Sequence, residues 1–233
     1  MHRIEIAPEL VERLTRERGG KLHVFDAIDP ARTAHVVIDM QNGFLESGAP
    51  VEVPVARAIV PQVNAISAAV RAAGGTNVFV RFTTSPDGRE TWSSFYDRFP
   101  VAVRDGHSQA FMPDAHYWQL WPELDVRPED LTVEKRRFGA FVPGSSDLHA
   151  ILQQRGIDTL IVTGTLTNCC CETTAREAMQ LNYKVIFVSD ANATLTDAEH
   201  NATLNNMCAL FCDVMSTGQA IDALARARTP EPV

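Results

Sequence analysis

The sequence predicts an α/β fold in which helices cover both faces of a mainly parallel sheet. Short apolar runs rich in β-branched residues alternate with stretches whose apolar residues recur every three or four positions. The first pattern is typical of strands buried on both faces, and the second is typical of amphipathic helices. Because strand and helix alternate along most of the chain, we expect a three-layer α/β/α sandwich with right-handed crossovers.

Six segments have the strand pattern, and five have the helix pattern. The predicted strands are residues 34–39, 77–82, 131–135, 158–164, 184–190 and 213–217. The predicted helices are residues 55–73, 145–155, 172–182, 197–211 and 218–227. The first helix is followed by Gly74 and Gly75, and the second begins at a Ser/Asp cap and ends at Gly156. These are the usual boundary signals of helices.

Residues 83–130 break this alternation, because they join two predicted strands without a clear long helix. They contain all three tryptophans of the chain. A connection of this length inside one domain is usually functional or contains structure of its own. One interpretation is one or two short amphipathic helices that cover the sheet, with their aromatic side chains in the core. The other is a wall or lid over a pocket, or a subunit interface, and the two interpretations are compatible.

Length and charge exclude several classes of protein. The 233 residues suit one domain, 31–233, preceded by a charged N-terminal arm, 1–30. The formal net charge of −8 disfavours nucleic acid as a partner, since proteins that bind phosphates usually have a basic face. No apolar run is long enough to predict a membrane-spanning helix, and the arm lacks the apolar core of a secretion signal.

The five cysteines do not suggest a disulfide framework, because three of them are consecutive and their number is odd. A reducing compartment is the better interpretation. We therefore expect a cytoplasmic protein that binds neither nucleic acid nor membranes.

Ligands of open parallel sheets bind at the carboxyl ends of the strands, so the residues that follow each predicted strand are the candidates for chemistry. Asp39 ends the first run and would be costly to bury without a partner. An Asp that caps a turn is an equally good interpretation. Residues 134–141, EKRRFGAF, follow the third run and, taken alone, favour a solvent-exposed turn.

The residues after the fourth predicted strand are the most informative. Residues 164–176, GTLTNCCCETTAR, lead from a buried strand through a turn into a helix. Cysteines at a helix N-terminus lie among unpaired N–H groups and the positive end of the helix dipole, which stabilise a thiolate and can hold an oxyanion. Any one cysteine can also be a small buried apolar residue. Because neighbouring helical side chains point about 100° apart, at most one of the three is expected to face a pocket.

These candidates lie in three segments of the chain: VVIDMQNGF at 36–44, EKRRFGAF at 134–141 and VTGTLTNCCCETTAREA at 162–178. Together, in this order and spacing, they resemble the isochorismatase-like cysteine hydrolase superfamily. Its members include nicotinamidases, N-carbamoylsarcosine amidohydrolase, ureidoacrylate amidohydrolase and isochorismatases. The resemblance covers about residues 30–220 and implies a six-stranded, mainly parallel, Rossmann-like sheet of order 3-2-1-4-5-6.

The resemblance also implies a catalytic triad of Cys170, Asp39 and Lys135. The family's nucleophile stands two residues after the Asn or Asp of a T-[ND]-x-C motif, which identifies Cys170 among the three cysteines. A cis peptide between Thr165 and Leu166 is implied as well, with the Leu166 and Cys170 N–H groups as the oxyanion hole. In this strand order Lys135 lies two strands from Asp39, about 10 Å away at ~4.8 Å per strand. Either its long side chain reaches back, or the chain bends there.

The implied reaction is hydrolysis of a C–N bond in a small linear amide, carbamoyl or ureido compound through a thioester, with release of ammonia or an amine. Nicotinamidases bind a metal through an Asp-x-His and a further His. Neither the residues after Asp39 nor residues 81–92 supply these ligands, so we expect no metal and no cofactor, and nicotinamide is disfavoured. The most similar members are the N-carbamoylsarcosine and streptothricin-type amide hydrolases.

Substrate contacts are predicted from position alone. Phe44, Trp92 and Phe138 are expected to wall the pocket. Arg81 ends the second strand and is a candidate to contact a substrate carboxylate, although a structural ion pair with an acidic residue is the alternative.

Two other functions stay open. Isochorismatases proper lack the nucleophilic Cys and hydrolyse a vinyl ether with the Asp alone, and a fold can also serve a non-enzymatic interaction. Because the family forms dimers and tetramers, the resemblance implies a homodimer or homotetramer. The N-terminal 30 residues and the aromatic segment are candidates to pack on a neighbouring subunit.

Overall fold

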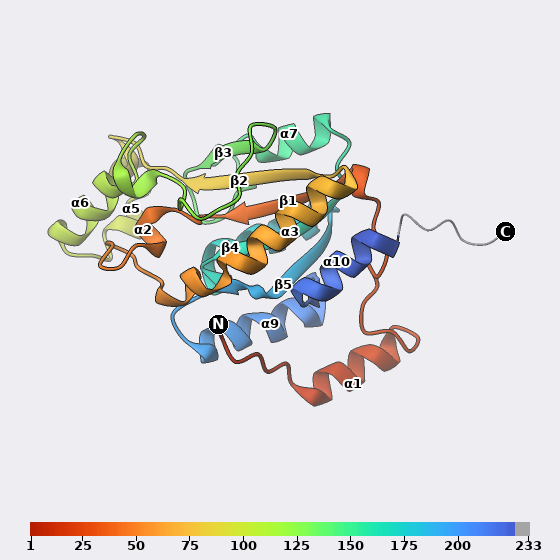
Figure 1. Ribbon diagram of the computed structural model, residues 1–233. Coiled ribbons are helices and arrows are strands. Elements are labelled where there is room, and N and C mark those ends of the chain that lie inside the picture. Colours follow the sequence, from red (N-terminus) through yellow and green to blue (C-terminus); the bar gives the residue numbers. More distant parts are fainter. Residues whose placement is uncertain (227–233) are drawn as a thin grey trace.

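A computed structural model describes residues 1–226 and confirms the predicted α/β sandwich. Six parallel strands form one sheet in the order β3-β2-β1-β4-β5-β6 (Figure 1). The strands are β1 (Thr33–Ile38), β2 (Thr76–Phe82), β3 (Leu131–Lys135), β4 (Thr159–Thr165), β5 (Lys184–Ala193) and β6 (Asp213–Met215). Each strand predicted from the sequence is present, with its ends displaced by a few residues at most.

Helices cover both faces of the sheet. The α-helices are α1 (Pro8–Glu17), α2 (Asn42–Leu45), α3 (Val60–Ala73), α4 (Gly88–Thr91), α5 (Ser93–Tyr96), α6 (Val101–Ala110), α7 (Leu148–Gln154), α8 (Glu172–Gln180), α9 (Asp197–Asn206) and α10 (Thr217–Arg226). Helices α3 and α10 pack on one face, and α1, α7, α8 and α9 contribute to the apolar core on the other. The predicted helix 218–227 corresponds to α10, and its last residue lies outside the described residues. Among residues 1–226, no helix combines the length and the apolar character needed to cross a bilayer.

Shorter helical turns complete the connections. Three are 3₁₀-helices, η1 (Pro30–Arg32), η2 (Pro54–Ile59) and η3 (His116–Trp118). Two are π-helical turns, η4 (Thr167–Cys171) and η5 (Met207–Phe211). At the carboxyl ends of the strands, the short helices α2, α5 and α6 gather beside the sheet (Figure 1). Four of the turns and short helices at this end of the molecule lie within the aromatic segment 83–130, namely α4, α5, α6 and η3.

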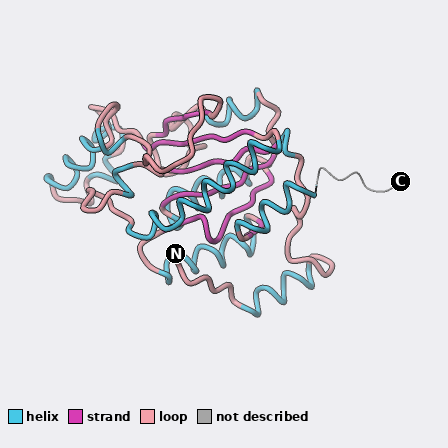
Figure 2. The backbone as a smooth tube through the Cα atoms, in the orientation of Figure 1, coloured by secondary structure: helices cyan, strands magenta, loops and turns pink. Residues whose placement is uncertain are grey.

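The N-terminal arm packs on the edge of its own sheet, beside α9 and β6 (Figure 2). The Arg18 guanidinium lies 3.5 Å from Asp213 and donates to the Cys208 carbonyl at 3.0 Å. Two further backbone N–H groups of the arm donate to Asp213 at 2.6 Å. The His2 ring stacks on His200 at 4.3 Å between centroids. The arm is thus a built-in part of this subunit rather than an extension that reaches away from it.

The two central strands approach each other closely at Gly164. Every residue of β1 and β4 is buried, and Gly164 pairs with Ile38 in the parallel register. Gly164 has φ +123°, a value that L-residues rarely adopt, and a Cβ there would overlap the Ile38 carbonyl oxygen. Only glycine therefore lets the end of β4 lie directly against the end of β1.

We expect Gly164→Ala to lower the free energy of unfolding by about 3 kcal/mol or more, because it combines an unfavourable φ with a backbone overlap. Urea denaturation followed by circular dichroism measures the change. Gly156→Ala is the matched control, since Gly156 also has a positive φ, +68°, but nothing within 4 Å of an added Cβ. It is expected to lose only about 1 kcal/mol. Equal losses in the two variants would contradict the close approach at Gly164.

Candidate active site

Asp39 and Lys135 form an ion pair at the carboxyl edge of the sheet. Lys135 Nζ lies 2.8 Å from Asp39 Oδ2, and neither side chain has any solvent exposure. Lys135 Nζ also donates a hydrogen bond to the Arg137 carbonyl at 3.0 Å. The contact with Asp39 is close but poorly aligned, since neither carboxylate oxygen has a hydrogen-bond partner of good geometry among residues 1–226. Two charges buried this deeply depend on each other for stability.

Lys135 reaches Asp39 across the end of β2. Strand β2 lies between β1 and β3, and its last residue, Phe82, pairs with Lys135 in the register. Lys135 Nζ lies 5.1 Å from the centroid of the Phe82 ring. The long side chain therefore spans the two-strand gap, and β3 needs no bend to bring the ammonium to the carboxylate.

Asp39 is held in an unusual backbone conformation directly after β1. Its φ of 52° lies in the left-handed region, which is uncommon for a residue other than glycine. The Asp39 N–H donates to the Val80 carbonyl at 2.9 Å. The Gln41 side chain donates to the Phe82 carbonyl at 3.0 Å and accepts from the Phe82 N–H at 2.8 Å. Gln41 thus fastens the end of β1 to the end of β2 and supports the turn that aims Asp39.

Sequence reasoning missed Gln41. The side chain has no solvent exposure, and it also donates to the Trp118 carbonyl at 2.8 Å. The available signal was a polar residue two positions after Asp39, between the apolar strand and Phe44. Such a residue needs hydrogen-bond partners wherever it is buried.

Cys170 completes the predicted triad. It is buried in η4, and its thiol interacts with the Asp39 carboxylate and the Lys135 ammonium. The sulfur also lines a cavity that is open to solvent. Three segments that are far apart in sequence therefore place a thiol, a carboxylate and an ammonium side by side.

A hydrogen bond and burial favour the neutral form of the Cys170 thiol. Burial raises the pKa of Asp39, against the opposing effect of Lys135. Burial also acts to lower the pKa of Lys135, but attraction to Asp39 and Cys170 outweighs it, and the pKa is raised. A hydrogen bond with Cys169 and burial together raise the pKa of the Cys170 thiol well above its ordinary value.

The helix N-terminus that the sequence predicts at the cysteines is present. Cys170 lies in the turn before α8, which begins at Glu172, and burial outweighs the favourable effect of Lys135 on the thiolate. An Asp39 carboxylate with increased affinity for a proton lies beside a thiol that can donate one. This arrangement suits proton transfer during the reaction rather than a thiolate formed beforehand.

The two amides implied for an oxyanion hole lie at the same turn. The Thr165–Leu166 peptide bond is cis, and Leu166 lines the cavity together with Cys170. The N–H groups of Cys169 and Cys171 both donate to the Leu166 carbonyl at 3.1 Å, which fixes the turn.

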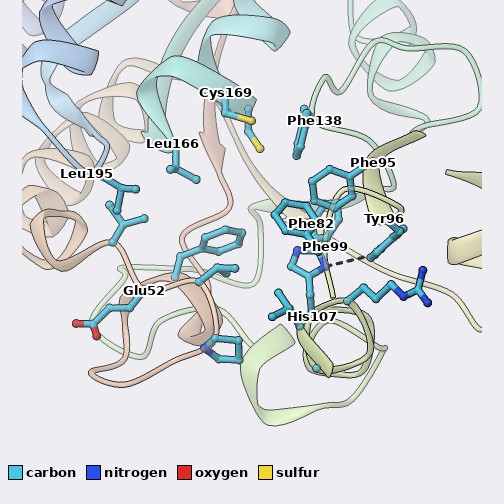
Figure 3. Close-up of a pocket in the computed structure, with 18 of the residues that line it drawn as sticks. Glu52, Phe82, Phe95, Tyr96, Phe99, His107, Phe138, Leu166, Cys169 and Leu195 are labelled. Atoms are coloured by element: carbon cyan, nitrogen blue, oxygen red, sulfur yellow. Dashed lines mark hydrogen bonds between the residues drawn. The ribbon is translucent and has the colours of Figure 1, made fainter. Parts of the chain in front are cut away.

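The cavity has a volume of about 490 Å³, and two cysteines line it. Figure 3 shows Cys169 at its inner wall, opposite the aromatic side chains of the 83–130 segment. The prediction that at most one cysteine faces a pocket is therefore wrong, because η4 is wound as a π-helix, whose wider turn brings neighbouring side chains closer in direction. Cys171, by contrast, is fully buried in the core.

Two of the three predicted wall residues line the cavity. Phe44 and Phe138 do so, whereas Trp92 does not. The Trp92 ring instead lies behind the wall, 4.7 Å from Phe138 and 4.5 Å from Phe95 between ring centroids. Trp92 is displaced because α5 begins directly after it and presents Phe95 to the cavity in its place.

The aromatic segment provides several wall residues that the sequence did not single out. They are Phe95, Tyr96, Phe99 and His107, from α5, α6 and the turn between them. Other aromatic residues of the segment, Phe111 and Trp118, are buried in the interior. The segment is thus both core and pocket wall, so the two interpretations hold together.

Arg81 does not point into the cavity. Its guanidinium carbon lies 3.5 Å from the centroid of the Trp118 ring, and the residue is not part of the cavity lining. Because side chains alternate along β2, Arg81 points to the opposite face of the sheet from Val80 and packs on the aromatic segment. The prediction that Arg81 contacts a substrate carboxylate is wrong for this geometry. The alternative, an ion pair, is replaced by cation–π stacking.

The remaining titratable side chains form no second centre. Among residues 1–226, no group of three His, Cys, Asp or Glu side chains is arranged to hold a metal ion. Cys208 and Cys212, four residues apart in sequence, are both buried in the apolar core.

The chain is similar to a family of known proteins. The sequence model of the isochorismatase domain family matches residues 33–219. The chain is 37% identical over 177 residues to YwoC of Bacillus subtilis, an uncharacterized isochorismatase family protein, covering 76% of this chain and 86% of that one. It is 31% identical over 175 residues to the ureidoacrylate amidohydrolase RutB of Pseudomonas syringae, covering 70% and 71%.

A solved structure shows the same architecture. The cysteine hydrolase from Pseudomonas syringae pv. phaseolicola superposes with a TM-score of 0.77 at 30% identity, covering 86% of this chain and 95% of that one. The family model spans most of the chain and includes β1 to β6 together with Asp39, Lys135 and Cys170. The chain therefore belongs to the isochorismatase family.

Proposed function

We propose that this isochorismatase-family hydrolase is a cysteine-dependent amidohydrolase that cleaves the C–N bond of a small linear amide, carbamoyl or ureido compound. The observation that carries the proposal is the meeting of Cys170, which lines the cavity, with the buried ion pair of Asp39 and Lys135. Relatives described as a ureidoacrylate amidohydrolase and a cysteine hydrolase support the same class of reaction.

The first half of the reaction forms a thioester. The Asp39 carboxylate accepts the proton of the Cys170 thiol as the sulfur attacks the substrate carbonyl carbon. The carbonyl oxygen becomes an oxyanion next to the Leu166 and Cys170 N–H groups. The C–N bond then breaks, Asp39 returns the proton to the departing nitrogen, and ammonia or an amine leaves.

The second half regenerates the thiol. A water molecule attacks the thioester carbonyl and gives one proton to Asp39. The C–S bond breaks, the carboxylic or carbamic acid leaves, and the proton passes from Asp39 to the Cys170 sulfur. Lys135 stays protonated throughout, because its pKa is raised by the two groups it faces. Its positive charge favours the carboxylate form of Asp39 and each negative charge that develops on the sulfur.

The buried position of Cys170 distinguishes this proposal from vinyl-ether hydrolysis. A reaction that uses Asp39 alone needs no sulfur within reach of the carboxylate. Here the thiol interacts with both members of the ion pair and faces the cavity, so the geometry favours nucleophilic attack by sulfur.

Replacing Cys170 with Ala is expected to lower kcat/KM for any amide that the protein hydrolyses by about a thousandfold or more, because the covalent step is lost. Ammonia release measures the loss, and iodoacetamide should label Cys170 and inactivate the native protein, with Asp39 accepting the thiol proton as the sulfur attacks the reagent. Cys171→Ala is the matched control, since Cys171 is the neighbouring thiol but lies in the core. Full activity of Cys170→Ala would rule out the sulfur nucleophile, and retained vinyl-ether hydrolysis would identify the Asp-only reaction.

Replacing Lys135 with Met is expected to move the acid limb of the kcat/KM–pH profile to higher pH by about one unit or more. Lys135 lowers the pKa of Asp39, so its removal raises that pKa further, and a higher pH is needed to obtain the carboxylate that acts as base. The sign for stability follows from the same shift. A folded-state pKa above the unfolded value makes stability fall as pH rises, so the variant's unfolding free energy should fall between the unfolded-state pKa of the Asp39 carboxyl and its raised folded-state pKa, and should be level above the folded-state pKa.

Lys184→Met is the control for this prediction. Lys184 begins β5, is half-exposed and pairs with Asp158 at 3.6 Å, away from the cavity residues. Its removal should leave the pH profile in place. An unchanged acid limb in Lys135→Met would show that Asp39 is not the base.

A further inference from the structure

We propose that the substrate carries an uncharged apolar group, aromatic or branched aliphatic, next to its scissile C–N bond, and that the site discriminates against substrates with a carboxylate. This inference rests on the proposed function, because it names the substrate class of the same cavity. Two observations support the inference. The side chains that line the cavity beside Cys170 are mainly apolar, and the few charged side chains among them already form ion pairs.

The cavity wall is built mainly from aromatic rings and aliphatic side chains. Phe82, Phe95 and Phe138 face the inner end, and Leu166 and Leu195 lie on the other side, as Figure 3 shows. Phe44 adds a further ring. A volume of about 490 Å³ is within the range of small-molecule pockets and exceeds what a bare primary amide or urea would fill. Apolar walls of this extent favour a ligand that removes them from water.

The acidic side chain in the cavity lining, Glu52, already has hydrogen-bond and ion-pair partners. Glu52 lies 2.8 Å from the Arg57 guanidinium and accepts a hydrogen bond from the Gly48 N–H at 2.8 Å. In Figure 3 its carboxylate points away from the cysteine side of the cavity. Glu52 therefore offers no free counter-charge for a cationic substrate, and its negative charge opposes the approach of an anionic one.

The cations near the site are also engaged. Arg104 is the one guanidinium in the lining of the described cavity, and its Nη1 lies 3.4 Å from Asp97. Lys135 is fully buried against Asp39. Arg81 stacks on an indole ring outside the cavity. A substrate carboxylate would have to draw Arg104 away from Asp97, because no other Lys or Arg side chain lines the cavity.

The remaining polar groups in the wall are neutral. Burial lowers the pKa of His107 to about 4, so the imidazole is uncharged near neutral pH. Its Nδ1 shares a hydrogen bond of 3.3 Å with the Tyr96 hydroxyl (Figure 3). These two groups satisfy each other, and they suit contact with an uncharged substrate better than with a carboxylate.

The first experiment compares two series of amides with the purified protein. The neutral series is acetamide, isobutyramide and phenylacetamide, and the anionic series is succinamate and N-carbamoylglycine. We expect kcat/KM for ammonia release to rise along the neutral series by about fourfold per buried methylene equivalent, the change that corresponds to ~0.8 kcal/mol. The anionic compounds should be at least about tenfold poorer than phenylacetamide.

The outcomes separate this inference from the function on which it rests. If the anionic compounds are hydrolysed as well as or better than phenylacetamide, the apolar preference is wrong and the amidohydrolase proposal stands. If neither series releases ammonia and iodoacetamide does not label Cys170, the amidohydrolase proposal fails and the inference fails with it. If acetamide and phenylacetamide are hydrolysed equally well, the aromatic walls do not contact the substrate, which also overturns the inference.

A pair of variants on α6 tests the same point within the protein. Val103 lines the cavity and is 54% exposed, whereas Val101 on the same helix is 55% exposed and is not part of the lining. Val103→Arg should lower the ratio of kcat/KM for phenylacetamide to that for N-carbamoylglycine by about tenfold, because it places a free cation at the apolar wall. Val101→Arg should leave the ratio unchanged, since its charge lies outside the cavity.

Light scattering on both variants excludes the main alternative use of this surface. If Val103→Arg changed the oligomeric state and left the substrate ratio unchanged, the apolar entry would be covered by a second copy of the chain, and the substrate proposal would be wrong. An altered ratio at unchanged mass would support it.

Discussion

The buried ion pair between Asp39 and Lys135 is the constraint on which the rest of the site depends. Removing a carboxylate and an ammonium from water costs several kcal/mol for each ion, and their attraction offsets this only if the two groups are held at short range. The sheet holds them there, because the Lys135 side chain crosses the end of β2 above Phe82 and Gln41 ties that strand to the turn carrying Asp39. The reactive groups are therefore fixed by strand register rather than by a mobile loop.

The third member of the triad reaches this pair through backbone geometry. Gly164 lets the end of β4 lie against Ile38, the residue before Asp39, so the turn that follows β4 begins beside the carboxylate. The turn then winds as η4 and places Cys170 against the ion pair, with Leu166 at the cavity wall. A side chain at residue 164 would separate the two strands, and the distance between Cys170 and Asp39 would grow with it. The position of Cys170 thus depends on the absence of a Cβ six residues earlier.

The parts of the molecule that were predictable from the sequence are those fixed by burial and by strand order. Buried strands are recognisable as apolar runs, so the strands could be predicted. The segments around Asp39, Lys135 and Cys170 have the order and spacing of a known family, so the strand order and these three candidate residues could be predicted as well. The directions of Trp92, Arg81 and Cys169 could not. Each depends on how the short helices of residues 83–130 pack or on the π-helical winding of η4, and neither leaves a periodic signal in so few residues. Gln41 was missed for a related reason, since its partners are backbone groups that no side-chain motif reveals.

The residues at the strand ends and the residues of the connection 83–130 also have different proposed roles. The first concern the type of reaction, and the second concern the choice of substrate. The groups proposed to act on the C–N bond lie directly after β1, on β3 and in the turn after β4, whereas much of the cavity wall comes from the connection that follows β2. Connections can change while a sheet retains its register. RutB, at 31% identity, is described as acting on ureidoacrylate, an anion, yet the cavity here presents rings and aliphatic side chains, and its one guanidinium already faces Asp97. Similarity to such a relative is therefore an argument about the type of bond that is hydrolysed. The residues of the aromatic segment 83–130 are the argument about which group the substrate carries next to that bond.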